Sequence, residues 1–156
     1  MALSGSYVYV GTDADGLRIV DITKPTAPKE ISRLKCEGSV VAVAISVNSV
    51  YMADGNGEKA SLWIVDVTNR TAPKEVGRYG AGAVTGFAVA DKRAFLAGKE
   101  FEVVDVTDSA NPKKLTRLAD ENVDKISHVA AQGTSVYVTG PPEQELSILR
   151  LTQGKP

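Results

Sequence analysis

Residues 62–68 read LWIVDVT, and three related segments occur along the chain: LRIVDIT at 17–23, FEVVDVT at 101–107 and LSILRLT at 146–152. Each is a short run of apolar, largely β-branched residues, which is typical of a buried β-strand. The threonines that end the four segments are 45, 39 and 45 positions apart. This period matches the roughly 40–50 residues of a four-stranded propeller blade.

A second series of recurring residues precedes these segments along the chain, and a third series follows them. The aromatic residues of the second series are 42, 44 and 42 positions apart: Tyr9, Tyr51, Phe95 and Tyr137. In the third series, a proline five positions after the threonine leads into a charged segment: KEISR, KEVGR and KKLTR. The spacing varies at glycine-rich tips between the aromatic residue and the threonine, where insertions cost little. We therefore predict four antiparallel strands in each complete repeat.

The second repeat illustrates the predicted unit. Its strands are expected at residues 40–47, 50–54, 62–68 and 74–79. Two-residue hairpin loops are expected between the first and second strands of the repeats, at Asn48-Ser49, Asp91-Lys92 and Gly133-Thr134. The first strand is rich in small and apolar residues, which suits the crowded inside of a propeller. The fourth strand alternates charged with apolar residues, as a solvent-facing edge should.

This order of segments resembles the LVIVD-repeat family of bacterial and archaeal β-propellers. The resemblance rests on an aromatic strand, a glycine-containing turn, the LxIVDVT segment and a proline before a charged strand, and it extends from Ser6 to Thr152. It implies a propeller fold and a binding or scaffolding role, often within cell-surface proteins. It brings no catalytic residues with it.

We predict one all-β domain over residues 1–156, a propeller-type array of about four blades with repeat units at about 4–37, 38–82, 83–120 and 121–156. The first unit is expected to lack its inner strand and the last its outer strand, which makes 14 strands. A closed propeller leaves no exposed sheet edge, whereas this array leaves a sheet face uncovered at each end. Three interpretations remain: a fragment of a longer propeller, a compact four-bladed monomer, or an arc that assembles with itself or with another protein.

Composition narrows the possible partners. The chain has 18 Lys and Arg against 19 Asp and Glu, so no strong electrostatic field favours binding to nucleic acid or to an anionic membrane. Cys36 is the only cysteine, which excludes an intrachain disulfide and a thiolate metal cluster. We find no export signal and no apolar run approaching the roughly 20 residues of a membrane span. The compartment stays open, since only the family resemblance points to the cell surface.

Several residues invite a functional interpretation. Asp13 and Asp15 alternate as at the start of a calcium loop, but the later glutamate ligand of an EF-hand is missing, which favours a simple hairpin tip. His128, the only histidine, lies in an inner strand and is expected to be hydrogen-bonded and structural. Cys36 is expected to be a buried or half-buried thiol. GAGAVTGFAV from Gly80 lacks the following helix of a dinucleotide fingerprint.

Two patterns recur in successive repeats. Asp21, Asp66 and Asp105 share one position of the third strand and are expected to accept backbone N–H groups in the turn that follows. The cations of the fourth strands form a stripe that Glu30 and Glu75 interrupt, as in a solvated edge: Lys29, Arg33, Lys74, Arg78, Lys113 and Arg117.

We therefore expect a non-enzymatic scaffold or protein-interaction module, with no catalytic, metal-binding or cofactor-binding residues. Its expected partner is protein, either another copy of the chain or a subunit of a larger assembly. The alternative is a ligand-binding or hydrolytic propeller with a site at the mouth of the central channel. The candidate residues of that alternative are His128, Asp13, Asp15 and Glu143.

Overall fold

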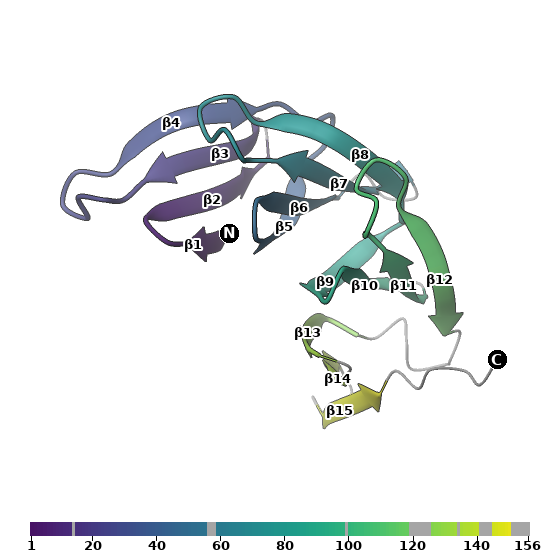
Figure 1. The fold of residues 1–156 in the computed structure, drawn as a ribbon. Coiled ribbons are helices and arrows are strands. Elements are labelled where there is room, and N and C mark those ends of the chain that lie inside the picture. Colours follow the sequence, from purple (N-terminus) through teal and green to yellow (C-terminus); the bar gives the residue numbers. More distant parts are fainter. Residues whose placement is uncertain are drawn as a thin grey trace.

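The computed structural model describes residues 1–13, 15–55, 59–98, 100–118, 126–133, 135–140 and 145–150. These residues form fifteen β-strands in four antiparallel sheets and contain no α-helix. The sheets follow one another around an arc, with β1, β5, β9 and β13 on its inside and β4, β8 and β12 on its outside (Figure 1). The predicted all-β propeller-type array is confirmed.

Each sheet is a meander whose strands pair in chain order. The first sheet contains β1 (Ala2–Ser4), β2 (Tyr7–Thr12), β3 (Gly16–Asp21) and β4 (Lys29–Leu34). The second contains β5 (Val40–Ser46), β6 (Ser49–Asp54), β7 (Ser61–Asp66) and β8 (Lys74–Gly80). The third contains β9 (Val84–Ala90), β10 (Arg93–Gly98), β11 (Phe101–Asp105) and β12 (Lys113–Leu118). The described part of the fourth contains β13 (His128–Gln132), β14 (Ser135–Gly140) and β15 (Glu145–Arg150).

The first sheet has one strand more than its sequence predicts. The expectation that its inner strand is missing is wrong, because β1 pairs with β2 through the registers Ala2 with Tyr9 and Ser4 with Tyr7. A three-residue strand is too short to show a hydrophobic period, which is why the pattern did not reveal it. The described strands therefore number fifteen, not fourteen.

The two middle sheets bury both of their faces. Along β7, Leu62 and Ile64 pack toward the third sheet, whereas Trp63 and Val65 pack toward the first. Successive side chains of a strand point to opposite faces, so a strand covered on both sides needs a continuous apolar run. The LWIVDVT segment is apolar in consecutive positions for this reason.

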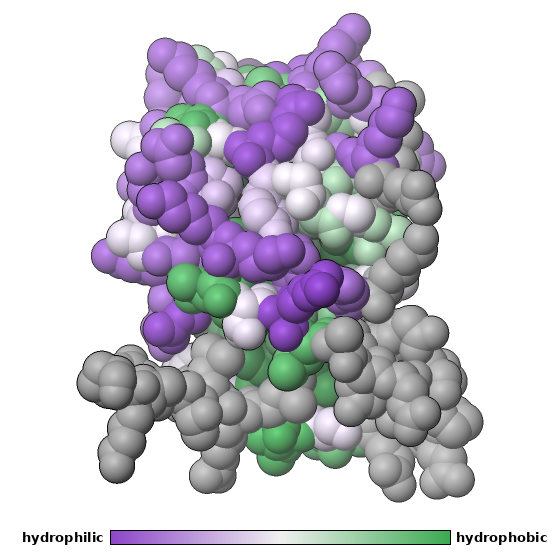
Figure 2. Space-filling view, turned by 90° about the vertical axis from the view of Figure 1, so that its right-hand side faces the viewer, coloured by the Kyte–Doolittle hydropathy of each residue, from purple (hydrophilic) through white to green (hydrophobic). Residues whose placement is uncertain are grey.

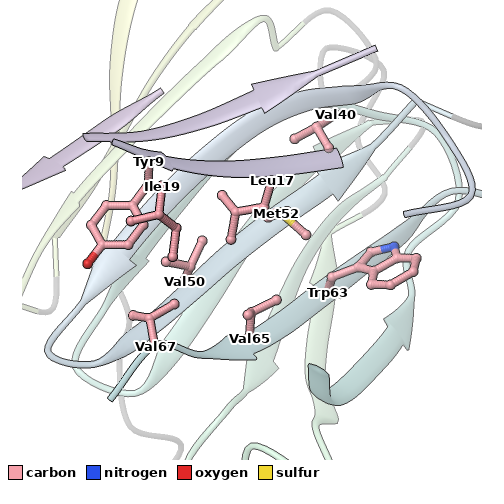
Figure 3. Packing of buried hydrophobic residues seen from close by; sticks show 9 residues of the cluster. All are labelled: Tyr9, Leu17, Ile19, Val40, Val50, Met52, Trp63, Val65 and Val67. Atoms are coloured by element: carbon pink, nitrogen blue, oxygen red, sulfur yellow. The ribbon is translucent and has the colours of Figure 1, made fainter. Parts of the chain in front are cut away.

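Among the described residues, three hydrophobic cores are found, and each lies between two consecutive sheets. The core between the first two sheets consists of Tyr9, Leu17, Ile19, Val40, Val50, Met52, Trp63, Val65 and Val67 (Figure 3). The core between the second and third contains Tyr51, Leu62, Ile64, Ala94, Leu96, Val104 and Val106. The core between the third and fourth contains Phe95, Ala97, Phe101, Val103, Ile126, Val136 and Val138. Residues at equivalent positions of the repeats form all three cores.

At two joints, the middle of an outer strand lies close to the backbone of the next sheet. Ser32 in the middle of β4 donates from Oγ to the carbonyl oxygen of Arg70, 2.5 Å away in the next sheet's turn between its third and fourth strands. Gly77, at the same position of β8, lies so close to the next sheet that a Cβ would overlap the carbonyl oxygen of Ser109. Glycine is required at that position because the two backbones touch.

The inner hairpin loops share a left-handed first residue. Gly5 and Gly133 have φ values of 56°, and Asp91 has 46°. Val47 has the same conformation, with φ 56°. Ser46 pairs in register with Ser49, so the residues between them form the loop. The loop is thus Val47-Asn48, and its predicted position at Asn48-Ser49 is wrong by one residue. The Asp91-Lys92 loop is where the sequence predicts it, since Ala90 pairs with Arg93.

We predict that Gly77→Ala lowers the free energy of unfolding by about 1–3 kcal/mol, because the joint between the second and third sheets must open to admit the new methyl group. Gly80→Ala is the matched control, since a Cβ at Gly80 meets nothing within 4 Å. The control should change the free energy by less than about 1 kcal/mol. Urea denaturation of the two variants makes the comparison, and equal stabilities would contradict the close backbone contact.

We also predict that Val47→Gly stabilises the protein by about 0.5–1 kcal/mol. A β-branched residue in the left-handed region carries a steric cost of roughly 1–2 kcal/mol, which exceeds the entropy cost of glycine. Val47 is 84% exposed, so little packing is lost with its side chain. The reverse variant Gly5→Val, with open space around its Cβ, should destabilise. Thermal unfolding midpoints that move the other way would refute the assigned loop conformation.

Candidate functional site

The recurrent acids hold the turns after the third strands, as the sequence predicts. The Oδ1 atoms of Asp21, Asp66 and Asp105 each accept a hydrogen bond from the backbone N–H two residues later, at 2.8 Å. Hydrogen bonds from Thr23, Thr68 and Thr107 respectively lower the pKa values of the three carboxyl groups. These acids therefore have a structural role in three turns and do not form a ring of ligands.

The two acids of the first hairpin tip have different partners. Asp13 accepts a hydrogen bond at 2.7 Å from the hydroxyl of Ser39, which precedes the second sheet. Asp15 forms an ion pair with Arg18, whose hydrogen bond lowers the pKa of that carboxyl group. Within the described residues, no three His, Cys, Asp or Glu side chains are arranged to hold a metal ion.

The histidine lies far from these acids along the arc. His128 is exposed at the start of β13, and its Nδ1 is 3.0 Å from the hydroxyl of Ser127. The first and fourth sheets stand at opposite ends of the arc, so His128 does not meet Asp13 or Asp15 (Figure 1). Glu143, the fourth candidate of the channel-mouth hypothesis, lies outside the described residues.

The other sequence candidates have structural environments. Cys36 is half-buried, as predicted, and its Sγ donates to the carbonyl oxygen of Gly38 at 2.9 Å. The glycine-rich stretch from Gly80 begins at the end of β8 and continues into β9, so a strand follows its glycines, as the sequence predicts.

The three arginines of the outer strands each form an ion pair with a neighbouring acid. Arg33 lies 2.7 Å from Glu30, and Arg117 lies 2.8 Å from Glu100. Such exposed pairs contribute about 0–1 kcal/mol each, so they make the rim soluble more than they stabilise it. Figure 2 shows much of this surface as hydrophilic, with hydrophobic residues gathered at the height of the fourth sheet.

A buried acid near the rim was not found by sequence reasoning. Asp54 is 4% exposed, and its Oδ2 accepts a hydrogen bond from Trp63 Nε1 at 2.8 Å. Its Oδ1 accepts from the backbone N–H of Ser61 at the same distance. Arg78 lies over the Trp63 ring, with its guanidinium carbon 3.6 Å from the ring centroid. The hydrogen bond to Glu75 is the main reason that the pKa of Arg78 is raised. Both carboxylate oxygens of Asp54 accept hydrogen bonds from within the second sheet, so the role of this cluster is structural.

The outward face of the fourth sheet carries apolar side chains that no described residue covers. Tyr137 pairs in register with Ile148, and Thr139 pairs with both Leu146 and His128, so these side chains share one face. Leu146 is 63% exposed and Ile148 is 55% exposed. The opposite face, with Val136 and Val138, packs on the third sheet. We call the outward set the C-face: His128, Tyr137, Thr139, Leu146 and Ile148.

The outward face of the first sheet is apolar too. Leu3 pairs with Val8, and Val8 pairs with Val20, so the three side chains share a face. Their neighbours Tyr9 and Ile19 point the other way, into the core with the second sheet. Leu3 is 64% exposed. We call this set, with Val10 and Arg18 beside it, the N-face: Leu3, Val8, Val10, Arg18 and Val20.

The architecture defines the class of the protein, which is a β-propeller-type repeat array. Residues 1–35 and 37–80 match the model of the LVIVD repeat. The chain therefore belongs to the LVIVD repeat family, which confirms the resemblance drawn from its sequence. No curated protein matches the chain in sequence.

Solved structures agree on the fold at low sequence identity. A computationally designed protein, Ika4, is 12% identical with a TM-score of 0.72, over 97% of this chain and 89% of that one. A chain of a nidogen–laminin complex is 14% identical with a TM-score of 0.71, over 96% of this chain and 58% of that one. Apo AztD from Citrobacter koseri is 18% identical with a TM-score of 0.63, over 96% of this chain and 42% of that one. The chain thus spans about half the length of the two natural proteins.

The turn acids predict a pH dependence. A carboxyl group whose folded pKa lies below its unfolded value stabilises the fold above the unfolded value, and this contribution disappears as the pH falls through the folded value. The thermal midpoint should therefore fall as the pH drops below about 3.8, the ordinary value for Asp21, Asp66 and Asp105. The triple Asp→Asn variant keeps the acceptor oxygens and should lose part of this dependence. An unchanged pH profile would contradict the role of these charges.

Proposed function

We propose that this chain is a non-enzymatic protein-interaction module that works by covering its N-face and C-face, through self-assembly or by docking on another protein. The propeller fold and its repeats support a scaffold or binding role. The observation that carries the proposal is the pair of outward apolar sheet faces at the two ends of the array.

The energetic case rests on the exposed aliphatic side chains. Burying one leucine or isoleucine is worth roughly 1.5–3 kcal/mol. Leu3, Leu146 and Ile148 are all more than half exposed. In the middle sheets, the positions equivalent to Leu146 and Ile148 are buried, and those equivalent to Leu3 are half-buried. A contiguous apolar patch on a sheet marks an interaction surface more often than an isolated exposed side chain does.

The competing idea of a catalytic or ligand site at the channel mouth has less support. Asp13 and Asp15 are engaged by Ser39 and Arg18, and His128 belongs to the far end of the arc. General acid–base catalysis needs its groups within hydrogen-bond reach of one substrate, which these residues do not provide together.

Among the described residues, no helix is long and apolar enough to cross a bilayer.

We predict that the chain has a mass above 16.5 kDa in sedimentation at micromolar concentration, and that Leu146→Glu/Ile148→Glu reduces this mass. Two charges placed in an apolar contact would be buried without partners, which strongly disfavours association. The matched control is Leu115→Glu, which alters a leucine that is 53% exposed on β12, away from both faces.

The control variant should keep the mass of the unchanged protein. A chain that is monomeric at every concentration, with or without the C-face substitutions, would exclude self-assembly. If Leu115→Glu lowered the mass as much as the double variant, the association would belong to the outer rim and not to the open faces.

A further inference from the structure

We infer that the partner of the C-face is the N-face of a second copy of this chain, so that copies join head to tail. The inference rests on the proposed function and adds the partner and the geometry to it. Its basis is a resemblance to the joints between sheets inside the chain. The C-face has the side chains of one side of such a joint, and the N-face has those of the opposite side.

The C-face repeats the residues that two interior joints use. Tyr9, Leu17 and Ile19 of the first sheet are buried against the second sheet. Tyr51, Leu62 and Ile64 of the second sheet are buried against the third. The fourth sheet has Tyr137, Leu146 and Ile148 at the same repeat positions, on the face turned away from the third sheet. The C-face thus has the side chains of a surface that receives another sheet.

The N-face repeats the opposite half of the joint. Val50, Met52 and Val65 of the second sheet fill the core against Tyr9, Leu17 and Ile19 (Figure 3). Val8, Val10 and Val20 of the first sheet stand at the same repeat positions and point outward. An aliphatic surface of this kind is what the tyrosine, leucine and isoleucine of an interior joint contact. The two ends are therefore complementary to each other and not to themselves.

The inner edge of the C-face departs from the interior pattern. His128 and Thr139 are paired in register at the position where the third sheet has Gly86 and Ala97. At that interior joint the backbones are close, since a Cβ on Gly86 would lie 2.7 Å from the carbonyl oxygen of Ser127. The larger His128 and Thr139 side chains hold an incoming inner strand farther away. The intermolecular joint is therefore looser than an interior joint, and association is reversible.

The geometry predicts a heterologous contact, in which each copy uses different faces toward its two neighbours. Such contacts close into rings when the rotation permits and otherwise continue as chains. Ring closure would also protect the outward sheet faces in the way that a complete propeller protects them. An N-face against an N-face would instead place two aliphatic surfaces together without the Tyr137 ring that fills the joint.

Two single-face variants test this arrangement. Leu3→Glu/Val20→Glu blocks the N-face, and Leu146→Glu/Ile148→Glu blocks the C-face. Each variant alone should be monomeric, with association weakened by more than about 30-fold, because a charged residue in a joint costs at least as much as a hot spot. An equimolar mixture should form dimers through the one joint whose two faces are both intact. Sedimentation of each variant and of the mixture gives the result, and urea denaturation confirms that both variants fold.

Each other outcome is decisive. If a single-face variant alone still dimerises as the unchanged chain does, the contact joins like faces, and the head-to-tail inference fails while the proposed function survives. If both variants are monomeric and their equimolar mixture is monomeric too, the N-face and the C-face do not bind each other, and the head-to-tail inference fails. If the unchanged chain is monomeric throughout, this inference and the self-assembly form of the proposed function fail together, which leaves docking on a different protein.

Discussion

The burial of both faces of each sheet is the constraint on which this structure depends. A propeller sheet has no core of its own, and each core forms where two consecutive sheets meet. Fully buried residues such as Leu17, Phe95 and Ile64 contribute roughly 1.5–3 kcal/mol each, well above the ion pairs of the rim. A sheet with one covered face has therefore gained only half of the burial that its sequence provides.

Close approach between sheets explains where small residues are needed. Gly77 on the rim and Gly86 on the inside both lie against backbone atoms of the following sheet. Between them, the second strands carry large buried side chains, such as Met52 in the second sheet and Phe95 in the third. The joints are thus narrow at the inner and outer strands and filled by large side chains in the middle. A residue that breaks this pattern at an end, such as His128, changes how closely a neighbour can pack.

The repeats made most of the fold predictable, and the failures have local causes. Strands from β5 to β8 lie within two residues of their predicted limits because four aligned copies reinforce one weak pattern. The short β1 has no period to detect, and the loop at Val47 has a residue that turns seldom use. Asp54 and Trp63 were missed because no other repeat has that pair. The turn acids were found because Asp21, Asp66 and Asp105 recur.

The two open faces differ in a way that bears on reversible assembly. Arg18 of the N-face occupies the repeat position of Trp63 in the second sheet and Glu102 in the third, so this position varies in polarity even within buried joints. Arg18 pairs with Asp15 and Glu30, which hydrates one side of an otherwise aliphatic surface. On the C-face, His128 and Thr139 have the same effect at the inner edge. Apolar centres with polar margins are typical of surfaces that exist both free and bound, which is the behaviour a head-to-tail joint between separate chains requires.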